Sequence, residues 1–412
     1  MKLLYDPKKD TFIGTATGNR PVCTADNAKH IFVCGTTGSG KTVVLSNYIK
    51  RAVEMDFPAL IIDGKGDTGK GSLLDIVESL QGKKKVYVIN MTDPQRSDKY
   101  NPFRNTSPTM AKDMLINMTE WSEEHYKLNT ERYLQRLVYL LHMAEIPLTF
   151  QNIIRYMAVE PFKNLSADLF RANKLTKADH ALNTELLKSS GRIAENALAR
   201  FATIAESELG QIFDSEGIDI YTAMQENAII LFILNPLLYP EISPLMGRLI
   251  TIDSKKAISK LYQSGNSRTF FIMDEINVYA STALVDLVNK SRSANVTCIL
   301  ATQSLSDLDA AVNESYKEQI IENCNNYIVL RQNSSINAEH WANILGTRAT
   351  LEVTHQLQQT AMGATETGFG SAKRVREYLY HPDDIKALQA GKGIFLSRDL
   401  NANCKVNIHK PF

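Results

Sequence analysis

The chain has 412 residues, of which 44% are hydrophobic and 22% charged, and its formal net charge is +1. This length and composition suit a globular protein of two or three domains. A net charge near zero excludes strong attraction to nucleic acid or to an anionic membrane through the overall field. Any such contact must therefore come from local clusters of basic residues.

The apolar and cysteine patterns place the chain, as given, in a reducing, aqueous compartment. Its longest apolar run, residues 228–234, is far shorter than the ~20 residues that span a bilayer. The five cysteines form no C-x-x-C pair and no spacing typical of a zinc site. We therefore expect a cytoplasmic protein with buried, reduced thiols.

The clearest motif is residues 35–42, which match the phosphate-binding loop pattern G-x-x-x-x-G-K-[ST] at every fixed position. Glycines let successive backbone N–H groups turn toward phosphate oxygens, and the following helix adds a favourable dipole. We expect Lys41 to reach the β- and γ-phosphates of ATP and the Thr42 hydroxyl to bind Mg²⁺. The predicted nucleotide contacts are Gly35, Thr36, Thr37, Gly38, Ser39, Gly40, Lys41 and Thr42.

Short apolar runs recur along the chain and are separated by helical patterns. Runs of this length without polar alternation are typical of strands that are buried on both faces of a mainly parallel sheet. The predicted strands are residues 31–34, 59–63, 85–90, 228–234, 269–273, 296–300 and 327–330, and residues 393–396 and 404–408 suggest a closing hairpin. The predicted fold class is therefore α/β, a P-loop NTPase fold.

Residues 105–216 have a different character. They contain no strand-like run, and Leu134, Leu137, Val138 and Leu141 follow helical spacing. We predict an all-α insertion domain at 105–216 within a nucleotide-binding domain that consists of residues 1–104 and 217–412. The glycine-rich segment 363–370 is expected to be a mobile loop without chemistry.

A second acidic element completes the predicted site. The apolar run 269–273 ends in Asp274 and Glu275. A carboxylate at a strand tip suits a hard cation, so Asp274 is expected to hold Mg²⁺, directly or through water. Glu275 is expected to polarise the attacking water as general base. The alternative is a strand that ends in solvated acids, which is common.

Two further residues are candidates for catalysis. Gln303 follows the next apolar strand, where it is expected to sense the γ-phosphate or to position water, and its alternative role is to cap a turn. Arg292 precedes that strand and is the first candidate for an arginine that neutralises charge on the transferred phosphoryl group, in its own subunit or in a neighbour. Arg331 and Arg348 are weaker candidates, and each arginine has the alternative of a surface cation.

With these pieces in order, the chain resembles type IV secretion coupling proteins of the TraG/TraD kind, conjugative DNA pumps in the FtsK/HerA branch of RecA-like ATPases. The resemblance covers nearly the whole chain. It rests on GTTGSGKT at 35–42, IIDGKGD at 61–67, NPF at 101–103, FFIMDE at 270–275 and ILATQS at 299–304, and on the order of weaker pieces, NNYIVLRQN, LGT and REYLYHPDDIKAL, toward the C-terminus.

The resemblance implies a RecA-like fold and a homohexameric ring with ATP between subunits, although the isolated chain is expected to be a monomer or weak oligomer. It implies Lys41 and Thr42 for nucleotide and metal, Asp274 and Glu275 for metal and hydrolysis, Arg292 as the finger and Gln303 as the sensor. The implied partners are single-stranded DNA, a relaxase–DNA complex recruited by the helical insertion, and the membrane proteins of the secretion system.

Two features depart from the family pattern. Coupling proteins usually carry N-terminal transmembrane helices, so we expect either a missing N-terminal membrane segment or a membrane partner that holds the chain at the inner face of the membrane. Gly64 also replaces the usual proline of the second motif. A secretion-machine ATPase without DNA translocation and a nucleotide-gated recruitment adaptor remain alternatives.

Overall fold

The centre of the molecule is an 11-stranded sheet with the order β2-β1-β13-β12-β9-β3-β8-β7-β4-β6-β5. The computed structural model describes residues 5–264, 268–313, 315–360 and 363–412, with the backbone alone for 264, 354–360 and 363–371. Seven of the eleven strands, from β9 to β5, form an entirely parallel block, so the predicted α/β class is confirmed. Its strands are β3 (Ile31–Cys34), β4 (Ala59–Asp63), β5 (Val86–Asn90), β6 (Ile229–Ile233), β7 (Thr269–Asp274), β8 (Val296–Thr302) and β9 (Asn326–Val329).

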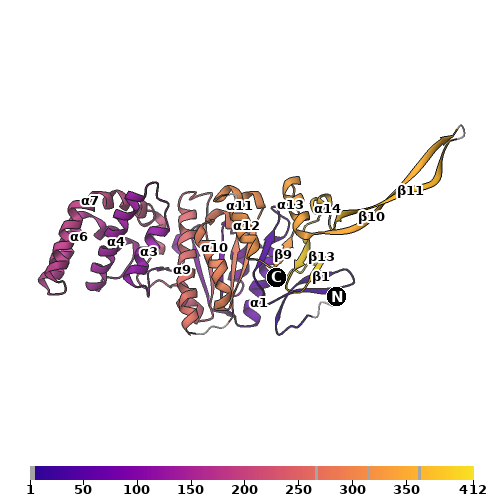
Figure 1. The fold of residues 1–412 in the computed structure, drawn as a ribbon. Helices are drawn as coiled ribbons and strands as arrows, with labels where there is room; N and C mark the ends of the chain where they lie inside the picture. Colours follow the sequence, from indigo (N-terminus) through magenta and orange to yellow (C-terminus); the bar gives the residue numbers. More distant parts are fainter. Residues whose placement is uncertain (1–4, 265–267, 314, 361–362) are drawn as a thin grey trace.

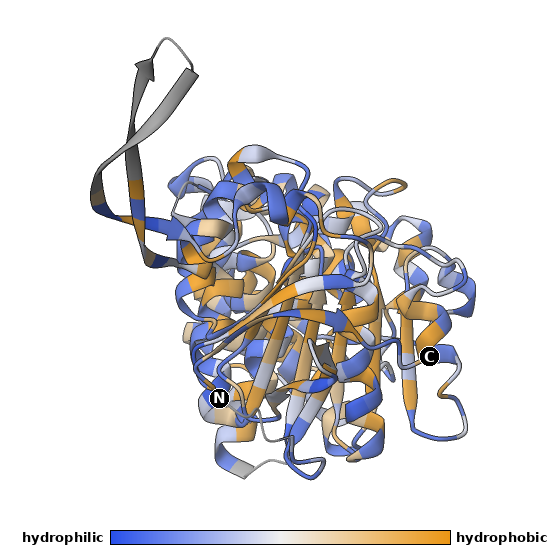
Figure 2. Ribbon diagram, turned by 90° about the vertical axis from the view of Figure 1, so that its right-hand side faces the viewer, coloured by the Kyte–Doolittle hydropathy of each residue, from blue (hydrophilic) through white to orange (hydrophobic). Residues whose placement is uncertain are grey.

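Helices cover both faces of this parallel block, which explains its unbroken apolar sequences. All its strands except the edge strand β5 are buried along their whole length. In Figure 2 the hydrophobic colour gathers along the strands and the hydrophilic colour in the outer loops. One face packs against α1 (Lys41–Glu54) and α2 (Leu73–Glu78). The other packs against α8 (Ile220–Gln225), α9 (Ile242–Ser264), α10 (Thr282–Ser291), α11 (Leu305–Ala311), α12 (Tyr316–Glu322) and α13 (Ser335–Leu345).

Four antiparallel strands extend the sheet beyond β9. They are β12 (Lys392–Ser397), β13 (Ala402–Ile408), β1 (Asp10–Ala16) and β2 (Arg20–Ala25), and α14 (Pro382–Lys386) precedes β12. The predicted hairpin near the C-terminus is confirmed as β12 and β13. The N-terminal hairpin β1–β2 was not predicted, because its residues alternate less clearly between polar and apolar types.

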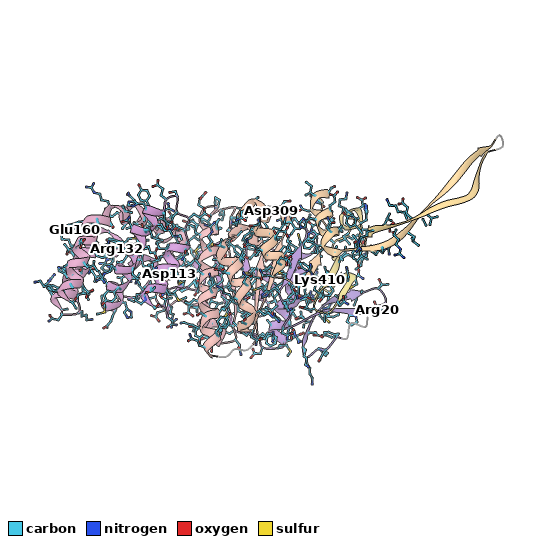
Figure 3. The ribbon with its side chains drawn as sticks, in the orientation of Figure 1. Arg20, Asp113, Arg132, Glu160, Asp309 and Lys410 are labelled. Carbon is cyan, nitrogen blue, oxygen red and sulfur yellow. The ribbon has the colours of Figure 1, made fainter. Side chains whose placement is uncertain are left out.

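The segment between β5 and β6 is helical, as the sequence predicted. Its helices are α3 (Pro108–Asn117), α4 (Glu124–Met143), α5 (Phe150–Met157), α6 (Val159–Arg171) and α7 (Lys177–Ala205). The hydroxyls of Ser107, Thr149 and Thr176 cap three of these helices by accepting a backbone N–H of the first turn. Charged side chains such as those of Arg132 and Glu160 lie on the outside of this region (Figure 3). The predicted domain limits at 105 and 216 stay a prediction.

A long hairpin projects from the body at the end opposite the helical segment (Figure 1). It consists of β10 (Thr347–Thr360) and β11 (Gly363–Tyr378), which pair with each other in a separate two-stranded sheet. The interpretation of residues 363–370 as a mobile loop was therefore wrong. Glycine and small polar residues weaken strand propensity, and here the cross-strand pairing overrides that preference.

A buried ionic network joins the helical segment to the body. Lys256 of α9 is 0% exposed and lies 2.7 Å from Asp253 and 3.8 Å from Asp219, both also 0% exposed. Its ammonium donates to the carbonyls of Pro102, at 2.8 Å, and Arg104, at 3.2 Å, in the chain that enters the helical segment. Asp219 lies in the chain that leaves it, so one buried cation holds both connections.

We predict that Lys256→Met lowers the free energy of unfolding by about 3–5 kcal/mol, because it leaves two buried carboxylates without their cation. The measurement is urea unfolding followed by circular dichroism. Lys255→Met is the matched control, because Lys255 pairs at 2.9 Å with Asp286 while both side chains are partly exposed, 34% and 49%. Its effect should stay below about 1 kcal/mol. Equal effects of the two variants would contradict a role for the network in holding the junction.

Candidate nucleotide-binding site

The phosphate-binding loop connects β3 to α1 at the carboxyl edge of the parallel block. Gly38 and Gly40 have φ of 74° and 113°, which side chains rarely adopt. A Cβ atom at Gly35 would lie 2.6 Å from both Leu330 Cβ and Ser39 Oγ, so this position also needs glycine. The Ser39 carbonyl accepts the Gly391 N–H at 3.0 Å. The loop is thus fixed by its glycines and by the segment that precedes β12.

Four of the predicted residues form one network above the sheet edge. The Lys41 ammonium donates to the Gly35 carbonyl at 2.8 Å and lies 3.3 Å from the Glu275 carboxylate. The Gln303 amide donates to the same Glu275 oxygen at 3.0 Å, and its carbonyl accepts the Thr37 hydroxyl at 3.3 Å. The structure therefore joins two glycine-loop residues to the acid after β7 and the glutamine after β8.

Asp274 ends β7 and is 4% exposed. On the adjacent strand β4, Asp63 is its register partner and is 2% exposed. Burial, reinforced by the charges of Glu275 and Asp63, raises the pKa of Asp274 to about 7. Burial also raises the pKa of Asp63 to about 6, although the backbone N–H groups of Lys65 and Gly66 donate to it.

The site therefore holds an excess of acidic groups. The carboxyls of Asp63, Asp274 and Glu275 lie close together, and the cations near them are the buried Lys41 and the more exposed Lys65. Like charges at short range in a low dielectric destabilise each other, and a divalent cation would relieve that repulsion. Among the described residues no group of three or more His, Cys, Asp or Glu side chains could hold a metal ion. The half-buried Thr42 hydroxyl and Asp274 thus fit Mg²⁺ only in company with phosphate oxygens and water.

The second motif packs directly behind these acids. A Cβ atom on Gly64 would lie 2.9 Å from the carbonyl oxygens of both Asp274 and Glu275. Glu275 itself has φ of 46°, a left-handed conformation that is uncommon for a residue with a side chain. Gly64, the departure from the family pattern, therefore leaves room for the turn that aims Glu275 at Lys41.

The structure does not bring Arg292 to the site. Arg292 is exposed and precedes β8, whereas Gln303 follows β8, so the strand separates them by roughly 20 Å at ~3.3 Å per residue. Burial lowers the pKa of His30, a residue that precedes β3 at this opposite edge, and the nearby charge of Arg292 adds to that shift. Arg292 therefore does not belong to the nucleotide site of its own chain. Arg331, after β9, lies closer, because its carbonyl accepts the Thr36 N–H at 3.0 Å.

Asp63 is the site residue that sequence reasoning overlooked. The sequence analysis used its segment only as part of a motif and gave Asp63 no role. The available signal was that an acid ends the apolar run 59–63 in the same way as Asp274 ends 269–273. Asp63 and Asp274 are neighbours because of the register between β4 and β7, which cannot be predicted from the sequence alone.

Comparison with known protein families matches residues 15–409 to the DNA-binding domain of type IV secretion-system coupling proteins. The chain belongs to this family. Its match to the family covers both the phosphate-binding loop and the acidic strand tip.

Solved structures of coupling proteins share the fold. The unbound bacterial conjugative coupling protein TrwB is 15% identical with a TM-score of 0.67, covering 98% of this chain and 89% of that chain. TrwB in complex with ADP and Mg²⁺ is 16% identical with a TM-score of 0.66, covering 97% and 89%. VirB4 of Thermoanaerobacter pseudethanolicus is 12% identical with a TM-score of 0.59, covering 97% and 96%.

A curated relative is shorter. An uncharacterised protein of Mycoplasma pneumoniae is 32% identical over 105 residues, which are 26% of this chain and 70% of that protein. With respect to the membrane helices usual in coupling proteins, none of the helices in the described part of the chain combines the length and apolar character needed to cross a bilayer.

We predict that Asp274→Asn stabilises the Mg²⁺-free protein more at high pH than at low pH. The folded-state pKa of Asp274, about 7, lies above the usual value of 3.8. The contribution of protonated Asp274 to the free energy of unfolding is therefore fully present below pH ~4 and is lost as the pH rises through 7. The loss is on the order of 4 kcal/mol, because each pKa unit corresponds to ~1.4 kcal/mol.

The measurement is thermal unfolding of both proteins in chelator from pH 4 to pH 8. The difference in Tm between the variant and the wild type should widen across this range. A constant difference would show that Asp274 ionises without cost, which would contradict the crowded arrangement of acids.

Proposed function

We propose that this coupling-protein family member hydrolyses ATP and uses the turnover to drive DNA into a type IV secretion channel. The network of Lys41, Glu275, Gln303 and Thr37 is the observation that carries the proposal. It joins the Lys41 ammonium, the Glu275 carboxylate and the Gln303 amide at the edge of the sheet where ligands bind in open α/β folds.

The nucleotide would be held by the loop from Gly35 to Thr42. Its backbone N–H groups and Lys41 would bind phosphate oxygens, and Thr42 and Asp274 would hold Mg²⁺. The metal would neutralise charge on the phosphates and on the acidic cluster. Support comes from the fit of this donor set, and from the similar coupling protein TrwB, which has been solved with ADP and Mg²⁺ and with non-hydrolysable analogues of ATP and GTP.

Glu275 is the proposed general base and Gln303 the proposed sensor. Glu275 is paired with Lys41 in the structure, so a phosphate that engages Lys41 would compete with that pairing. Released from Lys41, Glu275 would accept a proton from water, while Gln303 would retain its hydrogen bond to the carboxylate and report phosphate contacts through Thr37. The pairing thus links nucleotide binding in the loop to the release of Glu275 as a base.

The active form is proposed to be a homohexameric ring, with the isolated chain a monomer or weak oligomer. Arg292 supports an assembly, because its place at the opposite edge of the sheet leaves it useful only to a neighbour. It would stabilise negative charge on the phosphoryl group bound by the next subunit.

The proposed division of the chain is a nucleotide-binding domain, 1–104 and 217–412, and an all-α domain, 105–216. The all-α domain would recruit the relaxase bound to single-stranded DNA. Membrane proteins of the secretion system would hold the ring at the cytoplasmic face of the membrane. A secretion-machine ATPase without DNA translocation and a nucleotide-gated adaptor are the competing functions, and turnover that is stimulated by DNA separates the proposed function from both.

We predict that Lys41→Ala abolishes nucleotide binding or turnover, because phosphate loses the buried Lys41 ammonium.

Glu275→Gln should keep nucleotide binding within a few fold and slow hydrolysis by about 10²–10⁴, the usual contribution of a general base. Binding is measured with a fluorescent ATP analogue and hydrolysis by phosphate release. An active Glu275→Gln protein would remove the assignment of the base, and a wild type that binds ATP without turnover would favour the adaptor.

A second prediction tests whether Arg292 acts between subunits. Arg292→Ala and Lys41→Ala should each be inactive alone. Mixed in equal amounts they should recover activity, because about a quarter of the interfaces in a randomly mixed ring would pair an intact Lys41 with an intact Arg292. Phosphate release is measured against the mixing ratio. If Arg292→Ala alone retains full activity, the residue is a surface cation.

A further inference from the structure

A cavity of about 490 Å³ lies where the helical segment meets the body, away from the nucleotide site. Its walls come from the α3–α4 connection, from Arg248 of α9, from the start of α10 at Ser281 and Thr282, and from the end of α11. Figure 1 shows α3 beside α9 at this junction. No residue of the proposed nucleotide site lines the cavity.

The cavity walls hold hydrogen-bond donors without acceptors. The Thr119 hydroxyl, the Arg248 Nε and the Ser281 hydroxyl are buried and have no hydrogen-bond partner among the described residues. Thr119 is only 7% exposed, so its unpaired hydroxyl is costly unless something binds there. These groups therefore favour a ligand that accepts hydrogen bonds.

The first turn of α10 adds to this preference. Ser281 precedes the helix, and its side chain does not cap it. The first N–H groups of a helix have no acceptor within the helix, and the positive end of the helix dipole attracts anions. No acidic residue occupies the first turn of α10. The donors of Thr119, Arg248 and α10 thus suit an anionic oxygen such as a phosphate.

Acidic residues also line the cavity and limit what it can bind. Glu120 lies 2.5 Å from Arg248, and Glu124 and Lys127 are further wall residues. The Glu120 side chain is 81% exposed, whereas that of Arg248 is 18% exposed. Glu120 can therefore move into solvent when a stronger acceptor approaches the largely buried Arg248 side chain.

An aromatic platform adjoins the phosphate-binding donors. Trp121 lines the cavity and is half-buried, and the Arg200 guanidinium lies 4.8 Å from its ring centroid. Aromatic rings with stacked arginines beside a phosphate-binding groove are typical of proteins that bind single-stranded nucleic acid without sequence preference. An acidic peptide would use the cationic groups and would have no need of the platform.

We infer that this junction cavity is a binding site for single-stranded DNA, in which Arg248, Thr119 and the start of α10 bind a backbone phosphate and Trp121 stacks on a neighbouring base. The inference rests on the proposed function, because it names where the transported strand would touch the chain. Lys256, which lies eight residues further along α9 than Arg248, joins the same helical segment to the body through its buried network.

The test uses the tryptophan fluorescence of the full chain. The sequence has two tryptophans, Trp121 and Trp341, and Trp341 is 0% exposed in the core. An oligothymidylate of about 20 nucleotides, chosen because thymine quenches indole emission on stacking, should quench the wild-type protein. Trp121→Phe should lose the quenching, because the remaining tryptophan is sealed from the ligand.

Affinity is measured separately by anisotropy of labelled oligothymidylate across salt concentrations. Arg248→Gln should weaken binding about tenfold and reduce the slope of log affinity against log salt by about 0.7, the value for one phosphate contact of a single strand. Glu120→Gln should instead strengthen binding, because it removes the competitor for Arg248. Arg171→Gln is the control, because Arg171 is 75% exposed on α6 and pairs only with Asp168.

Opposite effects of Arg248→Gln and Glu120→Gln support the site, because damage to the fold would weaken binding in both. DNA-free ATP hydrolysis should stay at the wild-type rate in Arg248→Gln. The inference is overturned if the wild type binds oligothymidylate while Trp121 emission and the Arg248→Gln affinity stay unchanged. Quenching by polyglutamate and not by DNA would also overturn it. A wild type that binds no DNA under any condition contradicts the proposed function itself.

Discussion

The pairing of Lys41 with Glu275 is the contact on which the rest of the site depends. Both side chains are more than nine-tenths buried, and burying two charges costs several kcal/mol per ion that their attraction only partly returns. Such a pair contributes little to stability, so we infer that its main effect is to position the two side chains. The pair consists of the lysine of the glycine loop and the proposed base, and two further buried acids, Asp63 and Asp274, lie beside it. The resulting excess of negative charge at this edge of the sheet favours the binding of a divalent cation.

The geometry of that edge follows from the parallel sheet. Because β3, β7 and β8 run in the same direction, the loop after β3, the acids after β7 and the glutamine after β8 meet at one place although they lie far apart in the sequence. The helical segment follows β5 and precedes β6 in the chain, at the edge of this block. Lys256 of α9 contacts both of its connections to the sheet. The same helix supplies Arg248 to the junction cavity, so the junction and the proposed DNA contact share α9.

Most of the parallel sheet could be predicted from the sequence, because strands buried on both faces leave unbroken apolar runs such as 59–63 and 229–233. The phosphate-binding loop and the pairing partners Glu275 and Gln303 were also predicted, since their motifs are local. The features that could not be predicted depend on contacts between residues that are far apart in the sequence. The long hairpin of β10 and β11 depends on cross-strand pairing that composition hides. The closeness of Asp63 to Asp274 depends on register.

The central claim is that this arrangement of residues turns over ATP in an assembly that responds to DNA. Steady-state ATP hydrolysis, measured with and without single-stranded DNA over a range of protein concentrations, tests it most directly. The account predicts a specific rate that rises with DNA and climbs more steeply than linearly with protein concentration, because Arg292 must reach a neighbouring site. A rate per chain that is constant with concentration and indifferent to DNA would contradict it.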